Sequence, residues 1–161
     1  EGEILVRGET CFLGYVEGHE ILRPFTDDGC FATRDLGRLD ADGYLHITGR
    51  KDNMFIAGGE NIQPECIEAA LCRLDYVAQA AVVPVQHEEF GCTPVAFVRL
   101  APDATLDPNR ISADLAHALP NFMVPRRFFP WPEEDPAPDA KIARKDLAAL
   151  AHRLMESSPR A

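Results

Sequence analysis

The feature that most constrains the fold of this chain is a run of closely spaced glycines and fixed charges between residues 34 and 62. The glycines of this run are Gly37, Gly43, Gly49, Gly58 and Gly59. The charges that stand between them are Asp35, Arg50, Lys51 and Asp52. Glycine serves where a backbone must turn sharply or let another group come close. The run therefore predicts short strands, joined by tight turns, with charged side chains at the strand ends.

Residues 1–49 have the pattern of a β-rich segment. Strands are predicted at residues 3–7, 30–33 and 44–48, and the last of these alternates like a half-buried strand. Asp-Gly steps at Asp28-Gly29 and Asp42-Gly43 predict the turns that lead into two of these strands. Such a set of strands cannot bury a core alone. We interpret residues 1–49 as the β-rich end of a larger domain.

From Arg50 onward the pattern changes to alternating strands and helices. Strands are predicted at 53–57, 78–85 and 94–100, with a short one near 127–129. One helix is predicted to begin at Pro64 and a second at Asp107-Pro108, because proline suits the first helical position and aspartate caps a helix. A last helix is predicted at 143–155. Residues 50–161 thus read as a small α+β domain, a few-stranded sheet flanked by helices.

Composition and charge exclude several classes of protein. The chain has 161 residues, is 46% hydrophobic and carries a net charge of -10. No apolar run approaches the roughly 20 residues that a membrane-spanning helix needs, so no membrane span is expected. An acidic chain without a basic stripe does not predict nucleic acid or an anionic membrane as a partner. The chain begins with Glu1 rather than Met, and we interpret it as a fragment.

The cysteines and histidines do not form a metal-binding pattern. The five cysteines are scattered, odd in number and without a C-x-x-C pair, which argues against a disulfide framework and against a zinc site. The five histidines have no paired ligand spacing. We therefore predict no metal site in this chain, and reduced thiols in a cytoplasmic protein.

A few charged residues are candidates for binding or catalysis. A carboxylate at Asp35 and a guanidinium at Arg50 suit ribose hydroxyls and phosphate, although each could equally be an ordinary turn residue. Lys141, near a predicted helix start, would by itself be a surface lysine. Arg126 and Arg127 are either surface charges at a strand edge or contacts to a phosphate.

The ordered set of motifs resembles the adenylate-forming (ANL) superfamily, which contains acyl-CoA synthetases, peptide-synthetase adenylation domains and luciferases. The motifs are Thr33-Arg34-Asp35, Gly49-Arg50-Lys51-Asp52, Gly58 to Ile62, and Lys141 in Ala140-Lys141-Ile142-Ala143-Arg144. The resemblance covers essentially the whole chain. It implies that residues 50–161 are the mobile C-terminal lid domain, and that residues 1–49 end the N-terminal, ATP-binding domain.

The resemblance also implies a role for each motif residue. Asp35 would bind the ribose hydroxyls of ATP, and Arg50 would contact the ribose and phosphate. Asp52 would be the hinge about which the lid rotates between two catalytic states. Gly58-Gly59 would line the path of the coenzyme A arm. Lys141 would be the catalytic cation that stabilises charge at the α-phosphate.

The implied activity is ATP-dependent carboxylate–CoA ligation, through an acyl-adenylate and then a thioester. The implied cofactors are ATP, Mg²⁺ and coenzyme A, with the phosphate loop, the magnesium ligand and the acyl pocket outside this chain. The implied partners are the missing N-terminal domain and a carboxylic acid. We expect the isolated chain to be inactive, and the sequence leaves a homo-oligomer open.

The substrate class follows from a finer resemblance. Thr33-Arg34-Asp35 departs from the usual Thr-Gly-Asp, and with residues 58–65 and 90–96 it resembles the o-succinylbenzoate–CoA ligases of menaquinone synthesis. Two enzyme alternatives remain: another aryl- or fatty-acyl-CoA synthetase, or an adenylation enzyme that loads a carrier protein. The alternative from another class is a non-catalytic α+β interaction module.

Overall fold

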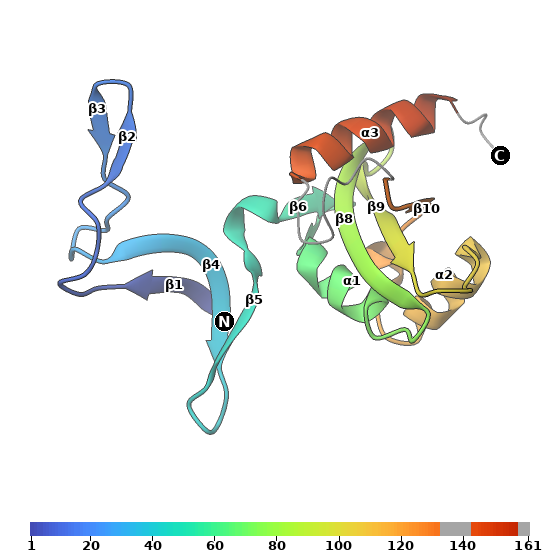
Figure 1. The fold of residues 1–161 in the computed structure, drawn as a ribbon, viewed down its shortest axis with the longest axis horizontal. Helices are drawn as coiled ribbons and strands as arrows, with labels where there is room; N and C mark the ends of the chain where they lie inside the picture. Colours follow the sequence, from blue (N-terminus) through green and yellow to red (C-terminus); the bar gives the residue numbers. More distant parts are fainter. Residues whose placement is uncertain (133–142, 158–161) are drawn as a thin grey trace. The chain divides into compact units, whose positions relative to one another are not determined.

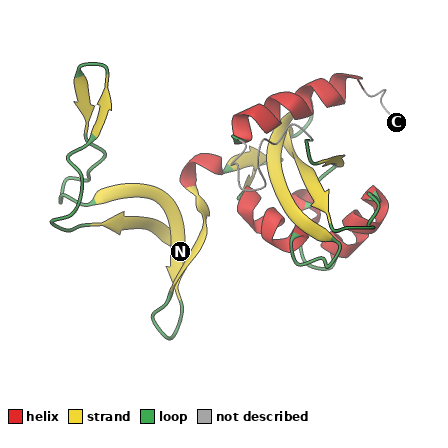
Figure 2. Ribbon diagram, in the orientation of Figure 1, coloured by secondary structure: helices red, strands yellow, loops and turns green. Residues whose placement is uncertain are grey.

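The computed structural model describes residues 1–132 and 143–157. The chain divides into two compact units, Glu1–Asn53 (unit 1) and Met54–Ala161 (unit 2). The ribbon in Figure 1 follows the elements along the chain, and Figure 2 distinguishes the β-rich unit 1 from the mixed unit 2. The domain boundary after residue 49 stays a prediction.

Unit 1 consists of two small antiparallel sheets. Its larger sheet has the strand order β1-β4-β5. The strands of this sheet are β1 (Gly2–Val6), β4 (Phe31–Leu39) and β5 (Leu45–Arg50). A separate hairpin joins β2 (Tyr15–Glu17) to β3 (Glu20–Leu22), and a short 3-10 turn, η1 (Lys51–Asn53), ends the unit. All three predicted strands are present. The β2–β3 hairpin was not predicted, because three-residue strands are too short to show a period.

Unit 1 has no apolar core of its own. Gly37 and Gly49 are its only buried residues. Many of its large apolar side chains are exposed: Leu5, Val6, Phe12, Leu13, Tyr15, Val16, Ile21, Leu22, Leu39, Tyr44, Leu45 and Ile47. The rings of Phe12 and Phe31 pack edge to face with 5.0 Å between their centroids, but they do so at the surface. As expected, these strands do not bury a core by themselves.

Unit 2 is an α+β domain built on a three-stranded sheet with the order β10-β9-β8. Strand β9 is antiparallel to β8 and parallel to β10. The sheet strands are β8 (Val77–His87), β9 (Gly91–Leu100) and β10 (Arg127–Pro130). The helices are α1 (Pro64–Leu71), α2 (Pro108–Ala116), the short η2 (Asn121–Met123) and α3 (Arg144–Ser157). A hairpin of β6 (Phe55–Ala57) and β7 (Glu60–Ile62) precedes α1. This architecture confirms the predicted fold class.

The sheet of unit 2 separates two apolar clusters. Successive side chains of a strand point to opposite faces, so β9 alternates between them. Ala96 and Val98 pack into the cluster that contains Ile67 of α1 and Ile111 of α2. Val95 and Phe97 pack into the cluster that contains Leu147 and Ala151 of α3. Figure 1 shows α3 on one face of the β8–β9 pair, with α1 and α2 on the other.

The helix starts agree with the sequence in two cases and differ in one detail. Asp107 caps α2, where its carboxylate accepts hydrogen bonds from the backbone N–H groups of Asn109 and Arg110. Pro64 takes the first turn of α1. Gln63 stands at the N-cap of α1 but makes no capping hydrogen bond through its side chain.

Candidate functional site

Asp35 and Arg50 face each other across neighbouring strands of unit 1. They are directly paired in the β4–β5 register. The Arg50 guanidinium donates a hydrogen bond to the Asp35 carboxylate, with Nη1 and Oδ1 2.6 Å apart. Both side chains stay partly open to solvent, 42% exposed for Arg50 and 33% for Asp35. The carboxylate keeps a free oxygen and the guanidinium keeps further N–H donors, as a site for hydroxyls and phosphate requires.

A second ion pair lies beside the first and shares Arg50 with it. The Arg34 guanidinium approaches the Asp52 carboxylate to 2.6 Å, whereas Arg50 approaches the same carboxylate only to 3.5 Å. The hydrogen bond from Arg34 is the main cause that holds the pKa of Asp52 below its ordinary value. Four alternating charges therefore run in the order Asp35, Arg50, Asp52, Arg34.

An irregularity in β4 brings these side chains together. Glu3 pairs with Leu36 and Leu5 pairs with Ala32, so the single β1 residue between them opposes three residues of β4. The bulge has Arg34 at its centre with a φ of 62°, in the left-handed region that non-glycine residues seldom adopt. The backbone N–H of Arg34 donates to the Glu3 carboxylate.

Gly58 and Gly59 form the tip of the β6–β7 hairpin, which precedes α1. Ala57 pairs with Glu60 across the two-residue turn, and both glycines have positive φ, 58° and 87°. Two consecutive residues with positive φ are what a type I′ hairpin turn requires. A Cβ atom on Gly58 would meet only the Phe90 ring, at 3.5 Å, and one on Gly59 would meet nothing. The local need for glycine is therefore conformational, and the outer surface of the turn is bare backbone.

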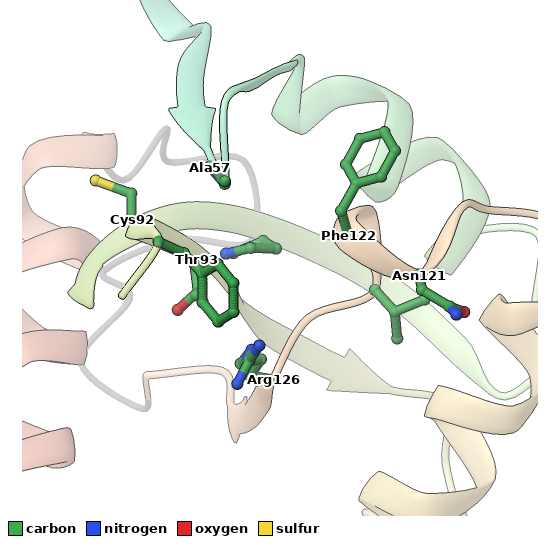
Figure 3. Close-up of a pocket in the computed structure, with 10 residues that line it drawn as sticks. Ala57, Cys92, Thr93, Asn121, Phe122 and Arg126 are labelled. Carbon is green, nitrogen blue, oxygen red and sulfur yellow. The ribbon is translucent and has the colours of Figure 1, made fainter. Parts of the chain in front are cut away.

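A pocket of about 120 Å³ opens beside this turn in unit 2. It is lined by Ala57, Gly58, Phe90, Cys92, Thr93, Pro94, Asn121, Phe122, Val124 and Arg126. The Arg126 guanidinium lies over the Phe90 ring, 4.8 Å from its centroid. In the close-up of Figure 3, the labelled Thr93 comes from β9, whereas Phe122 and Arg126 come from η2 and the connection that follows it. An aromatic ring, a cation and a glycine turn thus border one cavity.

Lys141, the predicted catalytic residue, lies outside the described residues. Arg144, three residues further along the sequence, is the first residue of α3 and is firmly held. Its guanidinium donates to both carboxylate oxygens of Glu68, to Glu65 and to the carbonyl of Val82. The neighbouring Lys145 is exposed. The start of α3 is thereby fixed to α1 and β8.

The predicted site residues fall into three groups. Asp35, Arg50 and Asp52 are in contact within unit 1. Gly58-Gly59 lies in unit 2, and Lys141 is not described. The sequence did not identify the pairing of Phe90 with Arg126, because no motif joins residues so far apart in the chain. It did single out Arg34 as a departure from the usual glycine, but not its contact with Asp52.

Comparison with known proteins identifies the domain. Residues 66–137 match the family model described as the AMP-binding enzyme C-terminal domain. The chain carries the C-terminal domain of an adenylate-forming enzyme. This finding confirms the resemblance to the adenylate-forming superfamily. The matched residues include none of the predicted site residues, whose roles stay predictions.

Several relatives of this AMP-binding domain are named as CoA ligases. The chain is 44% identical over 127 residues to a methyl-dioxo-octahydroindenyl-propanoyl:CoA ligase of Rhodococcus jostii, covering 78% of the chain and 25% of the relative. It is 36% identical over 150 residues to 2-succinylbenzoate–CoA ligase of Geobacillus kaustophilus, covering 92% and 30%. A solved structure of a variant of E. coli MenE with bound OSB-AMS superposes with a TM-score of 0.84 at 33% identity, covering 95% of this chain and 33% of that one. The chain therefore spans about a quarter to a third of the length of these relatives.

Three further properties of the described residues bear on binding and on cysteine chemistry. Among residues 1–132 and 143–157, no three His, Cys, Asp or Glu side chains gather to hold a metal ion. In that same part of the chain, no helix is long and apolar enough to cross a membrane. The five cysteines are free thiols.

Proposed function

We propose that this chain is the C-terminal part of an ATP-dependent carboxylate–CoA ligase. The observation that carries the proposal is the direct pairing of Asp35, in the middle of β4, with Arg50, the last residue of β5, 2.6 Å apart and partly open to solvent. In the first step a carboxylate oxygen attacks the α-phosphorus of ATP, and pyrophosphate leaves. In the second step the coenzyme A thiol gives up its proton and attacks the acyl carbon, and AMP leaves.

Asp35 and Arg50 are the proposed nucleotide-binding residues. The free carboxylate oxygen of Asp35 accepts hydrogen bonds from the ribose hydroxyls, and Arg50 donates to ribose and phosphate oxygens. Because the two side chains are already paired, each holds the other in position before the nucleotide arrives. The pair thus fixes the ribose end of ATP, and the phosphates extend toward the rest of the site.

Asp52 is the proposed hinge and Lys141 the proposed catalytic cation. The division between the two compact units falls after Asn53, next to Asp52 in the chain. A hinge of this kind absorbs a large backbone change in very few residues. Lysine is a compact charge on a flexible stem, which suits the charge that builds up at the α-phosphate as pyrophosphate departs.

Coenzyme A is proposed to approach along the β6–β7 turn. The bare backbone at Gly58-Gly59 lets a narrow chain pass, and the adjacent pocket offers the Phe90 face for stacking and Arg126 for a phosphate. The cavity suits one planar ring or a short linear segment rather than the whole cofactor. This pocket supports the thioester-forming half of the reaction, which the Asp35–Arg50 pair alone does not address.

The proposed acid is 2-succinylbenzoate, which places the protein in menaquinone synthesis. Support comes from the ligases of that name in Geobacillus kaustophilus and Salmonella typhimurium, and from the high superposition score with E. coli MenE. Another aryl- or fatty-acyl-CoA synthetase is the second candidate, because the Rhodococcus relative at 44% identity is named for a different acid.

The remaining parts of the proposal concern partners and location. Residues that complete the site, including any ligand of Mg²⁺, are proposed to lie in an N-terminal domain outside this chain. The described residues offer no cluster for that ion. When bound, Mg²⁺ would neutralise charge on the ATP phosphates. The free thiols support a cytoplasmic location.

The test is an assay of the full-length ligase with ATP, Mg²⁺, coenzyme A and a panel of acids, with thioesters detected by mass spectrometry. We expect o-succinylbenzoyl-CoA as the dominant product. A different thioester would keep the mechanism and reject the acid. An acyl-adenylate that accumulates without thioester would point to a carrier-protein acceptor. Full activity in a Lys141→Ala variant would reject the catalytic role of Lys141.

A further inference from the structure

Arg34 stands out in unit 1 because its conformation is unfavourable and its side chain has one specific contact. Its backbone has a φ of 62°, which a glycine would adopt without strain. Its side chain reaches Asp52, eighteen residues away, with 2.6 Å between Nη1 and Oδ1. A residue that keeps a strained backbone and places its charge on one partner invites a functional explanation.

The distances show which of the two arginines pairs with which of the two carboxylates. Arg34 lies 2.6 Å from Asp52, Arg50 lies 2.6 Å from Asp35, and the cross contact from Arg50 to Asp52 is 3.5 Å. Each carboxylate thus has its own close guanidinium. If Arg34 were neutral, Arg50 would be the nearest cation for both carboxylates.

From this arrangement we propose that Arg34 is a positioning residue for nucleotide binding: by pairing with Asp52, it keeps Arg50 with Asp35 and available to ATP. The proposal rests on the proposed function, since it takes Asp35 and Arg50 as nucleotide-binding residues. Without Arg34, the Asp52 carboxylate competes with the nucleotide for the Arg50 guanidinium.

The surroundings of Asp52 support its pairing with Arg34 rather than with another cation. Lys51, the other cation beside Asp52 in the chain, is engaged elsewhere, with its Nζ 3.0 Å from the Glu3 carboxylate. Arg34 also contributes more than Arg50 to the lowered pKa of Asp52. The side chains of Arg34 and Asp52 are 62% and 42% exposed, so the pair is solvated and its effect is modest. A modest bias is sufficient, because the proposal concerns competition for one guanidinium and not the stability of the fold.

The experiment measures the dissociation constant of ATP, without acid or coenzyme A, for the full-length ligase and its Arg34 variants. Arg34→Asn tolerates the left-handed backbone but removes the charge, and we expect it to weaken ATP binding about two- to fivefold. Arg34→Gly should weaken binding equally, because strain is not the cause. Arg34→Lys should restore binding to within twofold of wild type. The difference in the ATP dissociation constant between wild type and Arg34→Asn should become smaller as the salt concentration is raised.

A second set of variants separates this effect from a merely structural one. In an Asp52→Asn background the competing carboxylate is gone, so Arg34→Asn should no longer change ATP binding. An equal loss with and without Asp52, or unchanged binding in Arg34→Asn, would overturn the role of Arg34. Asp35→Ala and Arg50→Ala test the proposed function separately. If neither weakens ATP binding, the nucleotide site itself is misplaced, whatever Arg34 does.

Discussion

The guanidinium of Arg144, at the start of α3, lies 2.5 Å from the nearer carboxylate oxygen of Glu68 in α1. The same guanidinium also reaches Glu65 at 3.1 Å and the carbonyl of Val82 at 2.8 Å. One side chain thus ties a helix on one face of the sheet of unit 2 to a strand and to a helix on the other face.

Removing Arg144 should destabilise unit 2. Arg144→Ala leaves two partly buried carboxylates close together without a cation, and we expect a loss of about 2–3 kcal/mol in the free energy of unfolding. Arg144→Lys should recover only part of the lost stability, because an ammonium group cannot replace the planar set of N–H donors of the guanidinium. Chemical denaturation of the chain measures the effect, with the exposed Arg153→Ala on the same helix as the control. A loss no larger than that of the control would mean that the network adds nothing to stability.

The β6–β7 turn should resist any side chain at its tip. Gly58→Ala and Gly59→Ala force alanine to positive φ, at an expected cost of about 1–2 kcal/mol each. Because Cβ atoms at these positions meet no closer contact than 3.5 Å, asparagine, which tolerates this backbone, should cost less than alanine. Thermal unfolding of the variants checks the order, with Gly8→Ala as the matched control. Equal costs for alanine and asparagine would contradict a conformational origin.

Tyr76 should make the stability of unit 2 depend on pH in the alkaline range. Burial, followed by the hydrogen bond it donates to Asp114, raises the pKa of Tyr76 to about 12, against about 10 in an unfolded chain. A raised pKa stabilises the folded state below the unfolded pKa, so this contribution is complete below about pH 10 and is lost as pH rises toward 12. Titration of phenolate absorbance should show one late tyrosine that disappears in Tyr76→Phe. Three tyrosines that all ionise near pH 10 while the chain stays folded would refute this.

The pocket beside Gly58 should matter for coenzyme A and not for ATP. In the full-length ligase, Phe90→Ala or Arg126→Ala should raise the KM for coenzyme A about tenfold, by removing a stacking face or a phosphate contact. The KM for ATP should stay within twofold. Arg127→Ala, an exposed neighbour, is the control. Equal increases in both KM values would indicate a general disturbance of unit 2 rather than a coenzyme A site.

The sequence predicted best those elements whose residues form long periodic runs. Strands β8 and β9 were found because residues 78–85 and 94–100 form mostly apolar runs, and α2 because Asp107-Pro108 marks its start. Strand β7 was missed because three residues, of which only Ile62 is buried, carry no period. Ion pairs such as Arg34–Asp52 depend on the β4 bulge, which places residues eighteen positions apart in contact. Such contacts follow from tertiary geometry, which a single sequence does not encode locally.

The absence of buried apolar side chains in unit 1 has a consequence for calorimetry. The heat-capacity change of unfolding follows the apolar surface that becomes hydrated. Strands that already expose their apolar side chains contribute little to it. Every buried hydrophobic side chain among the described residues lies in unit 2. The heat-capacity change of unfolding of this chain should therefore scale with the length of unit 2. It should be smaller than the value for an ordinary globular domain of 161 residues.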